Sequence, residues 1–237
     1  MIRLFRTIRQ KLLSEKSYGI YILYASGEII LVVAGILLAL QIDTWSENKK
    51  TQNELTEIFD EIYEDLVLDS SSISNTLLER QLDFEAQTRV INAIRDDLPF
   101  SNQIQSDLGR IMIRRPIPLV SSGFNLLQES SLTSMEDRVL RLALIEYYEK
   151  DVLEMEEEYR DDKFEFETVL LPYVRLHFKV WEFGQQGIPV DWESLKADHY
   201  FISTLRINLN NVSSTILFMQ DGLKTATTII EMLDNRK

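Results

Sequence analysis

The segment from Ile20 to Ile42 constrains this chain more than any other part of it. It reads IYILYASGEIILVVAGILLALQI. The 21 residues from Ile20 to Leu40 would form a helix about 32 Å long at about 1.5 Å per residue, which is enough to cross the hydrocarbon core of a bilayer. We therefore predict a transmembrane helix at residues 20–42.

The composition of this segment favours a retained membrane anchor. Its one charged residue before Leu40 is Glu28, which costs about 3 kcal/mol on the insertion scale. The twelve Leu, Ile and Val residues of the same stretch return about 4 to 7 kcal/mol together. A cleaved signal peptide would have a shorter apolar region and a pair of small residues at its cleavage site, and the end of this segment, residues 37–41, lacks such a pair.

The flank before the segment is basic, with five Lys or Arg residues against one acid. The basic residues are Arg3, Arg6, Arg9, Lys11 and Lys16. This excess predicts an N-terminus in the cytoplasm and an exported remainder. Residues 1–19 are also amphipathic, so their basic side chains either lie among lipid headgroups or serve only as a topology signal, and both interpretations stay open.

Glu28 lies on the same side of the predicted helix as Gly35 and Ala39. Small residues four positions apart allow two helices to approach closely, and an acid at membrane depth suggests a functional site. A protonated Glu28 could bond a copy of itself or a neighbouring helix. Alternatively, it could relay protons or ions, or pair with a basic residue of a partner. An isolated acid rarely makes a relay, so we favour an association site at these three residues.

Charge divides the chain into two unequal parts. The first fifty residues hold seven Lys or Arg and four Asp or Glu, whereas the remainder holds eighteen against thirty-four. An exported part this acidic is a poor candidate for binding nucleic acid, which needs a basic face. The sequence contains no cysteine, so it can form neither a disulfide nor a thiolate metal site.

Two stretches resemble a known family. The run GEIILVVAGILLALQIDTWSENKK, from Gly27 to Lys50, follows RTIRQKLLSE and is similar to the N-terminal signature of an uncharacterised family. Its members are single-span membrane proteins of Gram-negative bacteria, known only as a domain of unknown function. The stretch from Ser121 to Glu149 resembles the family's Ser-Gly-hydrophobic turn and the following helix with paired tyrosines. We therefore expect a bacterial inner-membrane protein with a periplasmic C-terminal domain, and the resemblance implies no catalytic residues.

Helical periodicity continues after the apolar segment. Residues 45–98 contain neither Gly nor Pro. They carry apolar residues at helical spacing, at Leu55, Ile58, Phe59, Ile62 and Leu66 and then at Leu77, Phe84, Ile91 and Leu98. We expect a helix that leaves the membrane as a stalk, with a break or cap at the serines near position 71, and that ends at Pro99.

The second half of the chain predicts further helices. Pro116 and Pro118 favour an extended connection. Ser134 and Asp137 form a capping box ahead of a helix that should reach about Leu171, with a kink or an end at Pro172. Helical character should resume to Phe183, before a turn at Gly184 to Gly187, a cap at Asp191 and a last helix over about 198–233.

These patterns predict an all-α protein. One N-terminal transmembrane helix would continue into an exported antiparallel bundle of three or four long helices, because no run shows sustained alternation of apolar and polar residues. The predicted parts are a cytoplasmic segment at 1–19, the transmembrane helix at 20–42, the stalk and first bundle helix at 43–98, and the rest of the bundle at 99–237.

Motifs for catalysis and metal binding are absent from the sequence. It has no GxxxxGK[ST], GxGxxG, GxSxG or HExxH motif, and its two histidines lack the Glu-x-x-His spacing of di-iron bundles. The acidic run from Asp151 to Glu167 favours a solvated face over a Ca²⁺ or Mg²⁺ site. Arg110, Arg114 and Arg115 favour internal pairing over an anionic ligand or an acidic partner. We predict no catalytic residue, metal or cofactor, and no enzymatic activity.

Two functions fit these features. The first is a membrane-anchored, non-enzymatic helical scaffold or accessory protein, which contacts lipid and either self-associates or supports an envelope complex with another membrane protein. The second is an exported ligand-binding or sensory bundle that signals through a partner, since helical bundles bind small molecules between their helices. We expect the first because of the association site at Glu28 and the missing catalytic motifs.

Overall fold

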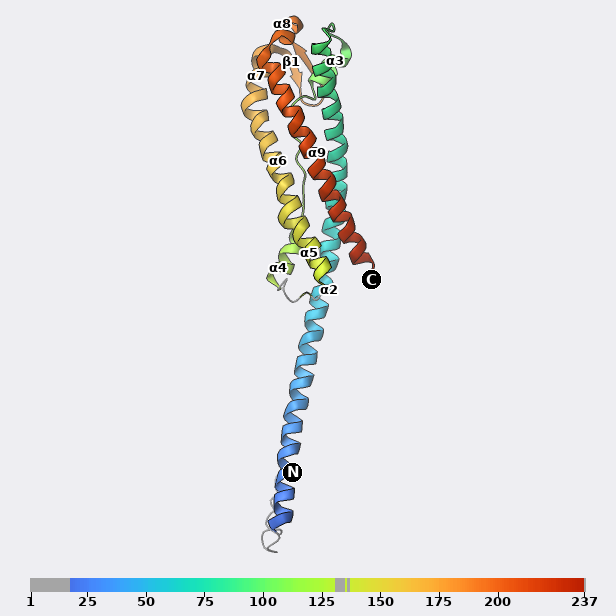
Figure 1. Ribbon diagram of the computed structural model, residues 1–237, viewed down its shortest axis with the longest axis vertical. Coiled ribbons are helices and arrows are strands. Elements are labelled where there is room, and N and C mark those ends of the chain that lie inside the picture. Colours follow the sequence, from blue (N-terminus) through green and yellow to red (C-terminus); the bar gives the residue numbers. More distant parts are fainter. Residues whose placement is uncertain (1–17, 131–134, 136, 237) are drawn as a thin grey trace. The chain divides into compact units, whose positions relative to one another are not determined.

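The computed structural model describes residues 18–130, 135 and 137–236. The described chain is mostly helical, as predicted (Figure 1). It divides into two compact units, Met1–Glu57 and Ile58–Lys237. Helix α2 (Tyr18–Arg95) contributes residues to both units. The serines near position 71 do not interrupt α2, because the helix buries neighbouring residues such as Asp69 and Ile73 against the rest of the second unit and leaves Ser71 exposed.

The first unit is helical at every described residue. Within the described part of the chain, α2 is the one helix that is long and apolar enough to cross a membrane. None of the residues in its apolar window is buried against protein. By length and composition, α2 is therefore a candidate membrane-spanning helix near the N-terminus.

The second unit combines the later part of α2 with short helices, one long helical run, a β-hairpin and a long final helix. Its elements after α2 are α3 (Asn102–Leu108), α4 (Ser122–Glu129), α5 (Arg138–Glu146), η2 (Tyr147–Asp151), α6 (Val152–Glu165), η3 (Phe166–Leu170), α7 (Leu171–His177), β1 (Phe178–Glu182), β2 (Gln186–Pro189), α8 (Trp192–Ala197) and α9 (His199–Asp234).

The helices α5, α6 and α7 form one run that is parallel to the second-unit part of α2. Tyr147 of η2 contacts Asp69 of α2, and Asp162, farther along the run, pairs with Arg80, farther along α2. We expected consecutive long helices to be antiparallel, and this expectation is therefore wrong for α2 and the run from α5 to α7. The reason is the connection at residues 109–121, which we call the strap. It returns along α2 in a largely extended form before α4 begins (Figure 1).

The strap is extended because of its two prolines. Pro116 and Pro118 lack an N–H, and the residue before each proline is driven away from helical backbone angles. Residues 113–121 accordingly have no regular secondary structure, as predicted. Helix α9 then runs antiparallel to α2, with Leu205 beside Gln87 and Asp234 beside Tyr63.

Pro172 does not break the long run. The preceding turn, η3, is a π-helical turn in which the N–H of Leu171 reaches back to the carbonyl of Phe166. This wider turn accommodates the residue that lacks an N–H, and Pro172 then lies in the first turn of α7, where proline is tolerated. The start of the run also differs from the prediction, because Asp137 caps it at Arg138; Ser134 lies outside the described residues.

The expected helix up to Phe183 is wrong. Residues 178–182 form β1, which pairs antiparallel with β2 through the register Trp181 opposite Gly187. Gly184, with a positive φ of 68°, makes the turn, which was predicted. Branched and aromatic side chains in FKVWE favour a strand once a partner strand is present. Asp191 caps α8 as expected, through an N–H bond from Glu193.

Candidate functional site

The predicted association residues lie on the first unit. Glu28, Gly35 and Ala39 are all exposed. They project from one side of α2, because their separations of seven and four residues are close to whole helical turns. A Cβ atom added to Gly35 would have no neighbour within 4 Å. The other predicted set, Arg3, Arg6, Arg9 and Lys11, lies outside the described residues.

The second unit contains a row of buried polar residues on α2 that the sequence analysis missed. The row comprises Asp65, Asp69, Arg80, Asp83 and Gln87, each at most 5% exposed. The predicted apolar stripe at 77, 84, 91 and 98 is instead half-buried or exposed. Helical spacing of these polar residues is present in the sequence, but charged side chains usually lie in solvent, so spacing alone does not indicate that they are buried.

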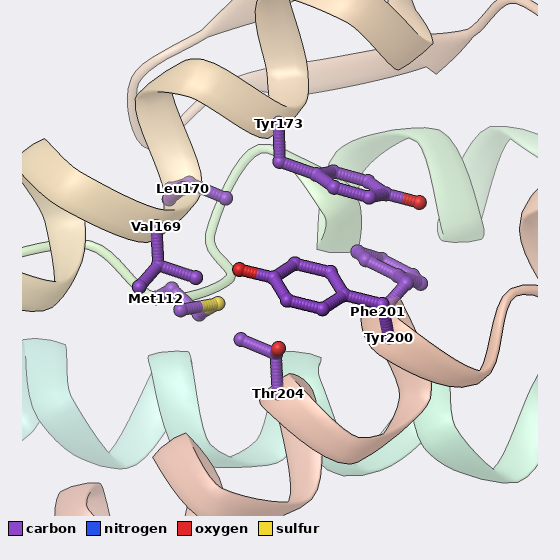
Figure 2. Close-up of a pocket in the computed structure, with 7 residues that line it drawn as sticks. All are labelled: Met112, Val169, Leu170, Tyr173, Tyr200, Phe201 and Thr204. Carbon is purple, nitrogen blue, oxygen red and sulfur yellow. The ribbon is translucent and has the colours of Figure 1, made fainter.

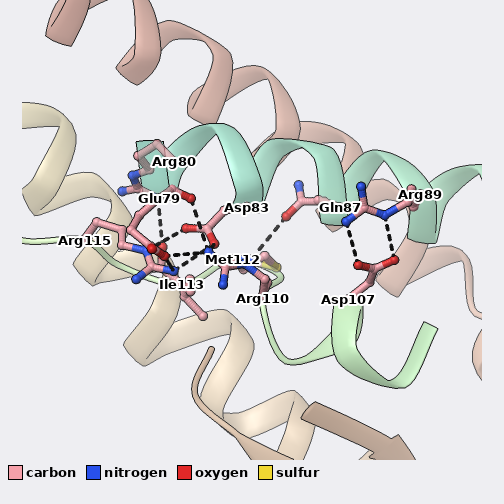
Figure 3. Close-up of polar contacts among 10 residues, drawn as sticks. All are labelled: Glu79, Arg80, Asp83, Gln87, Arg89, Asp107, Arg110, Met112, Ile113 and Arg115. Carbon is pink, nitrogen blue, oxygen red and sulfur yellow. Dashed lines mark hydrogen bonds and ion pairs between the residues drawn. The ribbon is translucent and has the colours of Figure 1, made fainter. Parts of the chain in front are cut away.

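This polar row holds the strap. Gln87 accepts a hydrogen bond from the N–H of Met112 at 3.2 Å and donates one to the carbonyl of Leu205 at 2.8 Å (Figure 3). Arg80 donates to the carbonyl of Ile113 at 2.8 Å. The N–H of Val120 donates to Asp69 at 2.8 Å. Side chains of α2 thus supply partners for backbone groups of a segment that has no regular secondary structure.

Arg80 is the most enclosed cation of the site, at 1% exposure. It forms an ion pair with Asp162 of α6, which is also buried. Burial lowers the pKa of Arg80 to about 10, so the guanidinium remains protonated at neutral pH. Arg80 therefore links three segments through one buried cation: α2, the strap and α6.

The arginines of the strap pair inside the molecule, as the sequence analysis preferred. Arg115 makes two hydrogen bonds to Asp83, at 2.7 and 2.9 Å (Figure 3). Arg110 donates to Glu79 at 2.6 Å, and this bond is the main reason that the pKa of Glu79 lies below its ordinary value. Arg114 donates to the hydroxyl of Tyr159 at 2.9 Å. Binding of an anionic ligand at these residues would first have to break these contacts.

A bidentate pair joins α3 to α2. Arg89 donates to the two carboxylate oxygens of Asp107 at 3.0 and 2.8 Å, and Asp107 is buried. The hydrogen bond from Arg89 satisfies the carboxylate, which would otherwise be costly to bury. The pair fixes the start of the strap close to α2.

The acidic run from Asp151 to Glu167 is only partly solvated. Asp151 and Asp162 are buried, and two half-buried glutamates contact α9. Glu158 accepts a hydrogen bond from Thr215 at 2.8 Å, and Glu165 accepts bonds from two asparagines, Asn208 and Asn211. The solvated-face interpretation is therefore wrong for these four acids. In the described part of the chain, no group of three or more His, Cys, Asp or Glu residues could hold a metal ion.

A small pocket lies where α7, α9 and the strap meet (Figure 2). It is lined by Met112, Val169, Leu170, Tyr173, Tyr200, Phe201 and Thr204. The rings of Tyr173 and Tyr200 are stacked, with centroids 5.9 Å apart. The cavity volume of about 10 Å³ is close to the minimum that one water molecule needs. In this conformation the pocket has no room for a metabolite.

Comparisons with known proteins found no counterpart. No protein-family model, no curated protein and no solved structure matches this chain. The resemblance of Gly27 to Lys50 to an uncharacterised family therefore stays a prediction.

Proposed function

We propose that this protein is a membrane-anchored, non-enzymatic helical scaffold or accessory protein of a bacterial envelope. The observation that carries the proposal is the apolar window of α2, none of whose residues is buried against protein. A core helix of a soluble protein would bury such a window. A membrane would cover it, and the same helix would continue out of the bilayer.

The proposed arrangement has the N-terminus in the cytoplasm and the second unit exported to the periplasm as a helical bundle. The basic flank of residues 1–19 supports this orientation, because Lys and Arg beside a membrane span favour the cytoplasmic side. The described polar contacts of the second unit support a structural rather than a catalytic role, because the buried carboxylates of Asp83, Asp107 and Asp162 are each paired with an arginine. The small pocket adds no specific observation in favour of a ligand-binding or sensory function.

Topology can be tested with a single introduced cysteine, because the chain has none of its own. Asp161 is exposed on α6, so Asp161→Cys should leave the fold intact. In spheroplasts, a membrane-impermeant maleimide should label this variant without lysis. The cysteine-free wild type is the control. Labelling that requires lysis would place the second unit in the cytoplasm and contradict the proposed orientation.

The proposed association surface is Glu28, Gly35 and Ala39. A protonated Glu28 can bond its counterpart in a second chain, and polar contacts of this kind contribute about 1 to 2 kcal/mol between membrane helices. Gly35 would let the two backbones approach, since no atom of the chain occupies the space beside it. The partner is either a second copy of this chain or another membrane protein.

We expect Glu28→Leu and Gly35→Ile each to weaken self-association about tenfold, because the first removes the polar contact and the second blocks close approach. Glu28→Gln should retain association, since an amide can still donate and accept. Native mass spectrometry of the full-length chain, released gently from its membranes, measures the dimer fraction.

Ala34→Ile is the matched control, because it places the same isoleucine side chain one residue away on a different side of the helix. A stoichiometric complex with a second membrane protein would favour the accessory role. A wild-type chain that is monomeric, with no partner, would contradict both versions of the proposal.

A further inference from the structure

Two carboxylates of α2 meet two tyrosines of η2 without a cation. Asp69 is 0% exposed and accepts hydrogen bonds from the hydroxyl of Tyr147 and the N–H of Val120, both at 2.8 Å. Asp65, one helical turn earlier, accepts bonds from Ser122 and from the N–H of Gly123, at 2.9 and 2.8 Å. These bonds attach η2, the strap and α4 to one face of α2.

The groups that act on Asp69 are acidic or neutral, namely Tyr147, the N–H of Val120 and Asp65. The strap contributes the N–H of Val120 to Asp69, and α4 contributes the hydroxyl of Ser122 to Asp65. Helix η2 contributes the two tyrosines and Asp151, whose charge also acts on Tyr147. Lys150 of η2 pairs with Asp151. Among the residues that the structure describes, no Lys, Arg or His forms an ion pair with Asp65 or Asp69. This distinguishes the cluster from the arginine-paired carboxylates farther along α2.

The cluster also has one unused polar group. The hydroxyl of Tyr148 is buried and has no hydrogen-bond partner among the described residues, although the charges of Asp65 and Asp69 both act on it. The ring of Tyr148 is held in place by stacking on Phe124 of α4, with centroids 4.4 Å apart. When Asp69 is protonated, its carboxyl O–H can donate a hydrogen bond, and a tyrosine oxygen can accept it. When Asp69 is ionised, it has no proton to donate.

We propose that Asp65, Asp69, Tyr147 and Tyr148 form an acid-tightened joint, which binds η2 and the strap to α2 more firmly when Asp69 takes up a proton. The joint is a regulatory device within the second unit and does not depend on the proposed membrane anchor. Acidification would stabilise the attachment of η2 and the strap to α2, and neutral conditions would loosen it.

The direction of the pH effect follows from burial. Burial raises the pKa of Asp69 from 3.8 to about 6, and the charge of Asp65 adds to this increase. The hydrogen bonds from Tyr147 and Val120 act in the opposite direction but are weaker. The stabilisation that this protonation contributes is therefore complete below about 3.8 and is lost as the pH rises through about 6. The relevant window is about pH 4 to 6, within which the folded chain binds a proton that the unfolded chain does not.

The test uses the full-length protein in detergent micelles. The wild type should melt several degrees higher at pH 5 than at pH 7.5, and Asp69→Asn should lose most of this difference because its side chain cannot ionise. An asparagine can keep both contacts, with its oxygen accepting from Val120 and its amide donating to Tyr147. Asp161→Asn, on the exposed surface, should behave as the wild type does.

A second measurement distinguishes titration of Asp69 from a purely structural role of its side chain. The protection of the Val120 amide against hydrogen exchange, corrected for intrinsic rates, should increase by up to about tenfold as the wild type is acidified from pH 7 to 5. Asp65→Asn should move the midpoint of this change to lower pH, because it removes the neighbouring negative charge. The proposal is overturned if Asp69→Asn retains the wild-type pH dependence, or if Val120 protection does not change with pH.

Discussion

Arg80→Met should destabilise the second unit by about 3 to 5 kcal/mol. The substitution removes the positive charge that pairs with Asp162 and the donor that satisfies the carbonyl of Ile113. Methionine has a similar length and is apolar, so the loss comes mainly from the unpaired carboxylate that stays buried. Denaturant unfolding of the full-length chain in micelles, followed by tryptophan fluorescence, measures the effect.

Arg160→Met provides the control for this variant, since it removes an arginine from the exposed side of α6 and should cost less than about 0.5 kcal/mol. The double variant Arg80→Met with Asp162→Leu should recover much of the stability, because replacing a buried ion pair by apolar residues is often close to neutral. A double variant as unstable as the sum of the two single variants would show that the buried ion pair is not the origin of the loss.

Gly109→Ala should cost about 3 kcal/mol, at the upper end of what overpacking usually costs. The added Cβ would lie 2.6 Å from the carbonyl carbon of Gln185 and closer still to the backbone nitrogen of Gln186. Both are backbone atoms, so no side-chain rotation can relieve the overlap. The hairpin must instead move away from the strap, and the hydrogen bond from the N–H of Gly184 to the carbonyl of Gly109, now 2.8 Å, would be lost.

The Gly109→Ala experiment has a local signature as well as a global one. Trp181 of β1 donates its indole N–H to the carbonyl of Leu108 at 3.1 Å, so displacement of the hairpin should change the near-ultraviolet circular dichroism of this tryptophan. Ser106→Ala, at an exposed position of α3, is the neighbouring control and should leave both the spectrum and the stability unchanged. A fully stable Gly109→Ala variant with an unaltered spectrum would contradict the close approach.

Local chemistry was sufficient to predict several elements. The apolar run of α2, the extended strap at Pro116 and Pro118, the cap at Asp191 and the last helix all follow from interactions among residues close in sequence. A proline constrains its own φ and its neighbour, and an N-cap bonds an amide two or three positions away. The amino-acid sequence alone therefore determined these helical and extended segments, and where a membrane-spanning helix can lie.

Only the tertiary structure decided which polar residues are buried. Periodicity identifies residues that share a helix face, but it assigns the apolar face to the core, and the buried face of α2 carries Asp69, Arg80 and Gln87. Their partners are 78, 33 and 118 residues away along the chain. Burying such groups is favourable only when those partners are in place, and the partners are brought together only by the path of the strap and the fold of the later helices. The β-hairpin has the same origin, because a strand is stable only beside a second strand.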